Sequence, residues 1–135
     1  MKNHNNHNKN NTNIFANPTV MAKEGMKFLK DLAFGKADPA FAEKAFTKIE
    51  FVNALRSEVE KRRTEAWAHY SAMCTAYPSS TDPTIMRLTQ SDRRRFDCYN
   101  TIAFHLDMII RSNCVGYEDV LTVLQTKLSD YKYNI

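Results

Sequence analysis

Several residue types that define protein classes are scarce in this chain. Three cysteines, three glycines and four prolines among 135 residues are too few for a disulfide scaffold, a collagen-like chain or a turn-rich all-β protein. No run of about 18 apolar residues occurs, so the sequence offers no candidate transmembrane helix. Residues 1–13 also lack the apolar stretch of a signal peptide. We therefore expect reduced thiols and a cytoplasmic, intracellular location, or a place in a virion.

Motifs for enzymatic chemistry are missing as well. The sequence contains no HExxH, no glycine-rich phosphate loop, no GxSxG and no Glu-x-x-His pair. Cys98 and His105 can share a helix face, but seven residues separate them by about 10 Å along a helix, too far for a thiolate–imidazole pair. We predict a protein that is not an enzyme, with no catalytic residue, no metal site and no cofactor.

The N-terminal segment has a composition of its own. Eight of the first 17 residues are asparagine, and only Ile14 and Phe15 are large and apolar. Such a segment cannot bury enough surface to offset the entropy of ordering it. We predict a disordered or extended Asn-rich arm over residues 1–18 and a single helical domain over residues 19–135. Phe15 is the arm's expected contact with a partner.

The rest of the chain has helical periodicity and no alternating strand pattern. Apolar residues recur every three or four positions, and Asp38-Pro39 and Asp82-Pro83 have the form of helix starts. The segment from Asp38 to Tyr77 predicts one long helix, or two helices if it breaks near Thr47 or Lys61. We predict an all-α fold, a small antiparallel helical bundle of three to four main helices.

The region after the Pro78–Pro83 loop is read as two separate elements. Asp82-Pro83 predicts a short turn that ends near Leu88, and Thr89 to Asp92 has the spacing of a capping box that begins the next helix. This interpretation places residues 93–95, three consecutive arginines, in the first turn of that helix, where the helix dipole disfavours cations. Three arginines at a position where they destabilise the helix would favour a binding role for them.

The net charge of +4 is concentrated in one part of the chain. Residues 1–37 hold six lysines against two acidic residues, whereas the remaining segments nearly balance. The candidate anion-binding residues are spaced along one helix face or clustered before Phe96: Lys23, Lys27, Lys30, Arg93, Arg94 and Arg95. Nucleic acid or another polyanion is therefore the alternative partner.

The apolar residues exceed what a single helical face needs. The segment around residues 96–110 is apolar on nearly all sides, and Trp67 lies off the main stripe of its helix. We predict Phe15, Trp67, Phe104 and Met108 as partner-binding residues. The expected function is non-enzymatic protein–protein interaction. The chain would be a self-associating, homo-oligomeric assembly or structural component, or a viral or accessory protein that inhibits a larger target.

Overall fold

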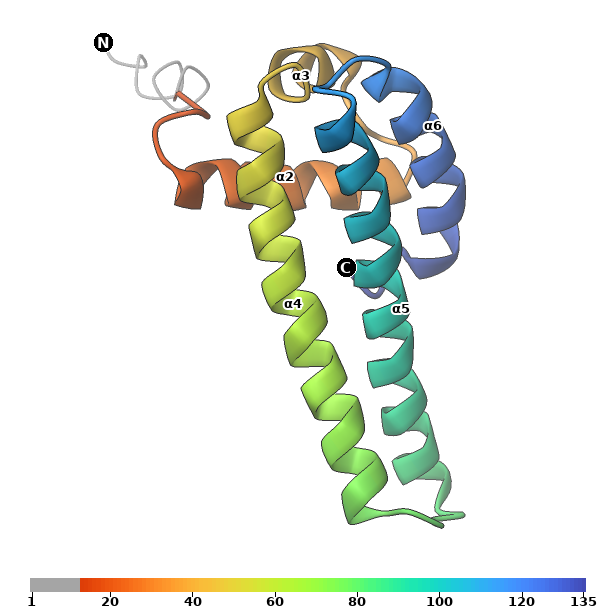
Figure 1. Ribbon diagram of the computed structural model, residues 1–135. Coiled ribbons are helices and arrows are strands. Elements are labelled where there is room, and N and C mark those ends of the chain that lie inside the picture. Colours follow the sequence, from red (N-terminus) through yellow and green to blue (C-terminus); the bar gives the residue numbers. More distant parts are fainter. Residues whose placement is uncertain (1–12) are drawn as a thin grey trace, which may run out of the picture.

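The computed structural model describes residues 13–135, and within that range the chain forms helices and turns without a strand. The all-α expectation is therefore confirmed. The α-helices and a final 3₁₀ turn, coloured along the chain in Figure 1, are α2 (Pro18–Ala33), α3 (Pro39–Ala45), α4 (Ile49–Ala76), α5 (Pro83–Arg111), α6 (Tyr117–Leu128) and η1 (Ser129–Tyr131).

Three of the helices begin with the same local device. Asn17, Asp38 and Asp82 each precede a proline and accept a hydrogen bond from a free backbone amide, at 2.9, 3.0 and 2.8 Å respectively. Proline at the first helical position loses no hydrogen bond, so the two residues together fix the start of the helix. Gly35 follows α2 with a φ of 74°, as expected for a left-handed residue after a helix end.

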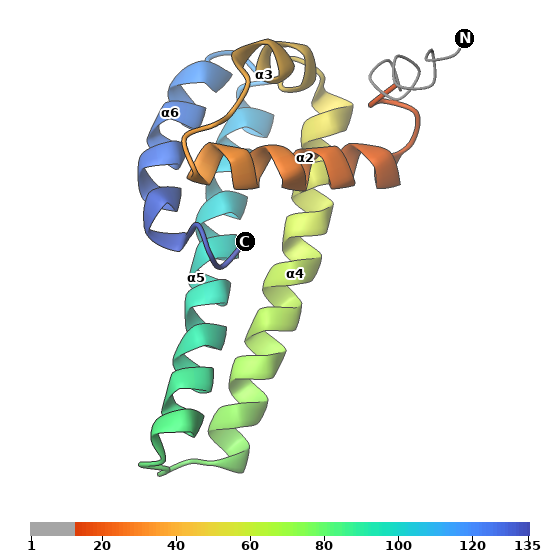
Figure 2. The same cartoon turned by 180° about the vertical axis from the view of Figure 1, so that it is seen from behind.

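The two longest helices, α4 and α5, form an antiparallel hairpin that extends well beyond the other elements. In Figure 1 helix α2 runs behind this hairpin and across it, and in Figure 2, from the opposite side, α2 lies in front. Helix α6 packs beside α5 and also contacts α2. The expected antiparallel arrangement thus describes α4, α5 and α6, whereas α2 crosses the hairpin (Figure 1).

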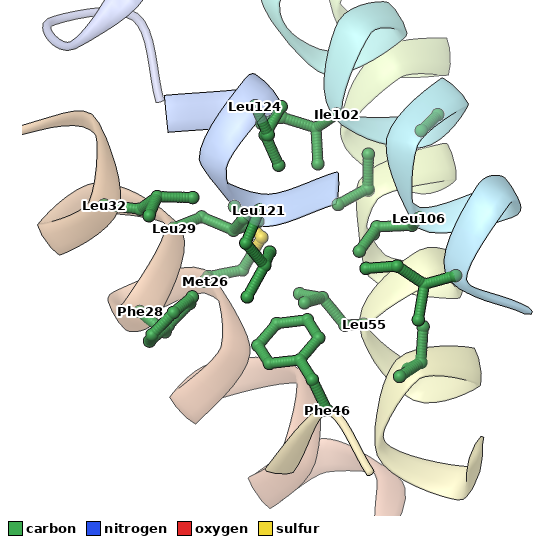
Figure 3. Packing of buried hydrophobic residues seen from close by; sticks show 14 of the residues in the cluster. Met26, Phe28, Leu29, Leu32, Phe46, Leu55, Ile102, Leu106, Leu121 and Leu124 are labelled. Carbon is green, nitrogen blue, oxygen red and sulfur yellow. The ribbon is translucent and has the colours of Figure 1, made fainter. Parts of the chain in front are cut away.

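The hydrophobic core lies where α2 and α6 cover the base of the hairpin. Figure 3 shows side chains from α2, α4, α5 and α6 converging there, with Phe46 at the end of α3. Phe46, Leu55, Leu106 and Leu124 are fully buried. This packing fixes one half of the hairpin and leaves the other half to extend from it.

The structure decides both uncertain helix boundaries. The chain breaks at Phe46–Lys48, which confirms the possible break near Thr47, and α4 then continues through Lys61. The predicted break at Leu88 is wrong, because α5 is continuous from Pro83. Thr89 does not cap a helix, since its hydroxyl donates to the carbonyl of Ile85 at 2.8 Å inside the helix.

Most of the predicted arm, residues 1–12, lies outside the described residues. Residues 13–17 form a turn in which the Asn13 side chain accepts a hydrogen bond from the Phe15 amide at 2.8 Å. Ile14 and Phe15 are half-buried against the core. Because Phe51 offers an apolar contact there, with its ring 6.1 Å from that of Phe15, this segment folds onto its own chain.

Candidate interaction surface

The outer half of the hairpin has no hydrophobic core of its own. We call residues 67–97 the distal hairpin; the structure describes all of them, and none is buried. Its exposed large apolar side chains are Trp67, Tyr77, Met86 and Leu88. An isolated helix pair gains little stability from a single seam, because helices in proteins are stabilised mainly by burial of an apolar face. This half of the hairpin therefore presents apolar surface that no described element covers.

One broad face of the hairpin points away from α2, and we call it the open face. Leu55 points toward α2, where it meets Gly25. Residues 56, 60, 63 and 67 lie about 80–140° around the helix from that contact and share one side of α4. Figures 1 and 2 show that α2 covers only the opposite side. Within residues 13–135, no helix thus covers the open face along the hairpin.

Trp67 is the large aromatic anchor on the open face. Its ring packs against Phe96 of α5, with centroids 4.9 Å apart, and against Tyr70, at 5.5 Å. A shallow depression beside it is lined by Arg63, Trp67, Arg93 and Phe96. Trp67 remains 46% exposed, so half of its surface is available for a partner. The structure therefore places the predicted Trp67 on an accessible surface.

Phe104 and Met108 lie on the same side of α5, one helical turn apart. Their neighbours Ile102, Leu106 and Ile109 are fully buried in the core. Phe104 is nevertheless 59% exposed and Met108 38% exposed. Some of the apolar residues around this helix thus belong to the core, whereas Phe104 and Met108 form an exposed apolar pair.

A polar network joins α4 to α5 between these apolar groups. Arg56 donates to Asp107 at 2.9 Å and to Glu60 at 3.0 Å, and Arg63 donates to Glu60 and Asn100, both at 2.8 Å. Hydrogen bonding to Asp107 is the main cause of the raised pKa of Arg56. Hydrogen bonds from Arg56 and then Arg63 lower the pKa of Glu60. The network keeps both helices in register on the open face.

The three arginines occupy a different setting from the one the sequence predicts. They lie in the middle of α5, so the expectation that residues 93–95 stand in the first turn of a helix is wrong. Arg93 pairs with Asp97 at 3.2 Å, whereas Arg94 donates to the carbonyl of Asp130 and covers the Tyr131 ring at 5.0 Å. These two side chains therefore point to different neighbours, Arg93 to α5 itself and Arg94 to η1.

The predicted lysines are exposed along the solvent side of α2, which crosses the base of the hairpin. Lys23 borders a groove between α2 and α4 together with Glu58, Lys61 and Arg62. Glu58 accepts a hydrogen bond from Arg62 at 2.9 Å, which offsets part of the positive charge there. Residues 93–95 lie farther along α5 toward the hairpin tip, so the structure leaves the two basic groups on separate elements.

Sequence reasoning did not identify four residues of the open face, one apolar and three polar: Met86, Gln90, Asp97 and Asn100. Their spacing of four, seven and three residues is that of one helix face. The predicted helix start at Thr89 placed Met86 on a different element, so the common face was not recognised. Gln90, Asp97 and Asn100 are polar, so a pattern of apolar positions does not include them. A continuous helix from Pro83 would have placed all four on one face.

Two chemistry-bearing groups of α5 are buried in the fold. His105 is buried, and its Nδ1 lies 2.8 Å from the Thr101 carbonyl, which satisfies it as expected for a core histidine. Burial raises the pKa of the Cys98 thiol to about 12, so this sulfur is not poised as a nucleophile.

Within residues 13–135, no three His, Cys, Asp or Glu side chains gather into a possible metal site. None of the helices in that range combines the length and continuous apolar character needed to cross a bilayer. Comparison of the chain with known proteins finds no match to a family model, a curated protein or a solved structure.

Proposed function

We propose that this chain is a non-enzymatic protein–protein interaction protein that binds its partner through the open face of the α4–α5 hairpin. The observation that carries the proposal is the distal hairpin, described in full and without a buried residue between positions 67 and 97. Helical apolar surface of this extent gains stability when a partner covers it. The hairpin would act as a docking arm, and the packed base would hold it in place.

The composition of the open face supports a protein partner. Trp67 is an aromatic anchor backed by Phe96, and Arg63 and Arg93 border the depression beside it. Tryptophan, tyrosine and arginine are the residues that most often dominate binding energy at protein interfaces. The polyanion alternative has less support, because the predicted lysines and arginines lie on separate helices and Glu58 and Asp97 offset part of the charge beside them.

A photocrosslinking experiment tests the proposal. p-Benzoylphenylalanine replaces Trp67 in the full chain, which is then irradiated in the cells that produce it. The matched control carries the same group in place of Val123 on α6, since Val123 is 49% exposed and Trp67 is 46% exposed. We expect a discrete protein adduct from position 67 and none from position 123. Equal capture at both positions, or no adduct at position 67, would refute the proposal.

A further inference from the structure

Helix α5 carries an exposed stripe along the open face. The stripe runs for five steps of four, three, four, three and four residues: Met86, Gln90, Arg93, Asp97, Asn100 and Phe104. At about 100° per residue, all six fall within an arc of about 80°. Its two ends are apolar and strongly exposed, and its centre holds one basic and one acidic side chain.

The stripe is complementary to itself when it is read in the opposite direction. Its steps are the same from either end, so an antiparallel copy places Met86 opposite Phe104 and Arg93 opposite Asp97. Gln90 then meets Asn100, an amide opposite an amide. Each contact occurs twice, as a two-fold axis requires.

We propose that two copies of this chain pair through the open faces of their α5 helices, antiparallel about a two-fold axis at the level of Arg95. This pairing rests on the proposed function, in which the open face binds a protein partner, and the partner is a second copy of the chain. The packed bases then lie at opposite ends of the pair. The hairpins overlap side by side in the middle, from the part of α5 without buried residues, which ends at Asp97, to its first core residues, which begin at Cys98.

Charge at the centre of the stripe favours a second copy over other occupants. Arg93 and Asp97 lie 3.2 Å apart within one chain, and their side chains are 51% and 38% exposed. A guanidinium has five donors and a carboxylate accepts several hydrogen bonds, so each group can also bond across the axis. The stripe has no net charge, and a strongly acidic or basic partner would leave one of these groups without its complement.

The neighbouring groups fit the same register. Arg63 donates to the Asn100 side-chain oxygen at 2.8 Å, which leaves the Asn100 amide donors free for Gln90 of the second copy. Trp67 contacts Phe96 of its own chain and so lies close to the level of the axis. It can cover the central charges from the side and exclude water from them.

The area of this contact predicts a reversible dimer. The stripe from Met86 to Phe104 is about 27 Å long, and the α4–α5 pair is about 20 Å wide. The contact therefore covers about 540 Å² on each copy, against roughly 800 Å² for a standard interface. We expect a dissociation constant on the order of 10 μM and rapid exchange.

Charge reversal with complementation tests the register. Sedimentation velocity of the full chain should show a dimer that forms between about 5 and 200 μM. Arg93→Asp and Asp97→Arg each bring like charges together at the axis. The dissociation constant of each variant dimer should therefore rise by about tenfold or more. An equimolar mixture of the two should form a heterodimer, because the new carboxylate at position 93 faces the new guanidinium at position 97.

A matched pair of variants on one helix controls for general effects of a new charge. Met86 and Leu88 are similarly exposed, at 56% and 51%, but point to nearly opposite sides of α5. We expect Met86→Asp to weaken the dimer and Leu88→Asp to leave it intact, with helix content checked by circular dichroism. Equal weakening by both, or by Leu88→Asp alone, would overturn the proposed face.

Disulfide trapping provides an independent measurement. In a Cys74→Ser background, the double variant Gln90→Cys/Asn100→Cys should form a crosslinked dimer under mild oxidation, whereas either single substitution should not. A wild-type chain that stays monomeric at 200 μM, or a charge-reversal mixture that fails to associate, overturns this inference. If the position-67 photocrosslinker then captures a different protein, the proposed function stands without the dimer.

Discussion

The crossing of α2 over α4 depends on the absence of a side chain at one position. Gly25 lies in the middle of α2, and a Cβ built there would be 2.7 Å from Cδ1 and 2.9 Å from Cδ2 of Leu55. Leu55 is fully buried, so its methyl groups have no open space into which to move. Gly25→Ala should therefore force α2 and α4 apart or push Leu55 out of its rotamer.

The expected magnitude follows from two opposing effects. Alanine in place of glycine inside a helix stabilises by about 1 kcal/mol, whereas overpacking a core costs about 1–3 kcal/mol. We expect Gly25→Ala to lower the free energy of unfolding by about 1 kcal/mol. In a Leu55→Ala background, which alone costs about 2–5 kcal/mol, the new methyl group fills part of the void. There Gly25→Ala should stabilise by about 1–2 kcal/mol.

Urea unfolding of the four proteins in this double-mutant cycle measures the change of sign. The wild type, the two single variants and the double variant should give a coupling energy of about 2–3 kcal/mol. Additive effects, with Gly25→Ala stabilising in both backgrounds, would refute the close contact between α2 and α4. A circular dichroism spectrum of each variant checks that the helices persist.

Three further predictions concern the thiols, the polar network and a helix cap. Cys74 is exposed whereas Cys98 and Cys114 are buried, so a thiol reagent should modify one cysteine in the native protein and three in urea; a second fast thiol would contradict the packing. The lowered pKa of Glu60 means that its contribution is present above the unfolded value near 4.5 and is lost as pH falls through the folded value. Urea midpoints of wild type should therefore fall more steeply than those of Glu60→Gln between about pH 5 and pH 3, and parallel curves would oppose this. Asp38→Ala should cost about 1 kcal/mol in urea unfolding, and Asp38→Asn should retain most of the cap; equal losses would exclude the capping role.

Local sequence signals predicted the helix starts accurately and their continuity less well. Asp38 and Asp82 act through hydrogen bonds to amides only two residues away, so their role is visible without the fold. Thr89 has the same side-chain chemistry, but its hydroxyl donates to Ile85 inside a continuous helix. A capping signal is ambiguous when the preceding turn can also be helical, and packing against α4 supports that turn here.

The predicted partner-binding residues differ in exposure, because the fold covers some helix faces and leaves others open. Trp67, Phe104 and Met108 carry apolar surface that the core does not use, and the structure leaves all three partly exposed. Phe15 has similar chemistry but lies against Phe51 of its own chain. Periodicity tells which residues share a helix face, but only the positions of the other helices decide which face is covered.

By itself, the sequence determined the helical class, the helix starts at proline and the near-neutral charge of everything after residue 37. These properties depend on interactions within a few residues or on composition. The tertiary structure alone decided that α2 crosses at Gly25, that α5 runs unbroken past Thr89, and that the distal hairpin extends without a core. Those outcomes depend on contacts between residues far apart in the chain, whose free energies no local pattern contains.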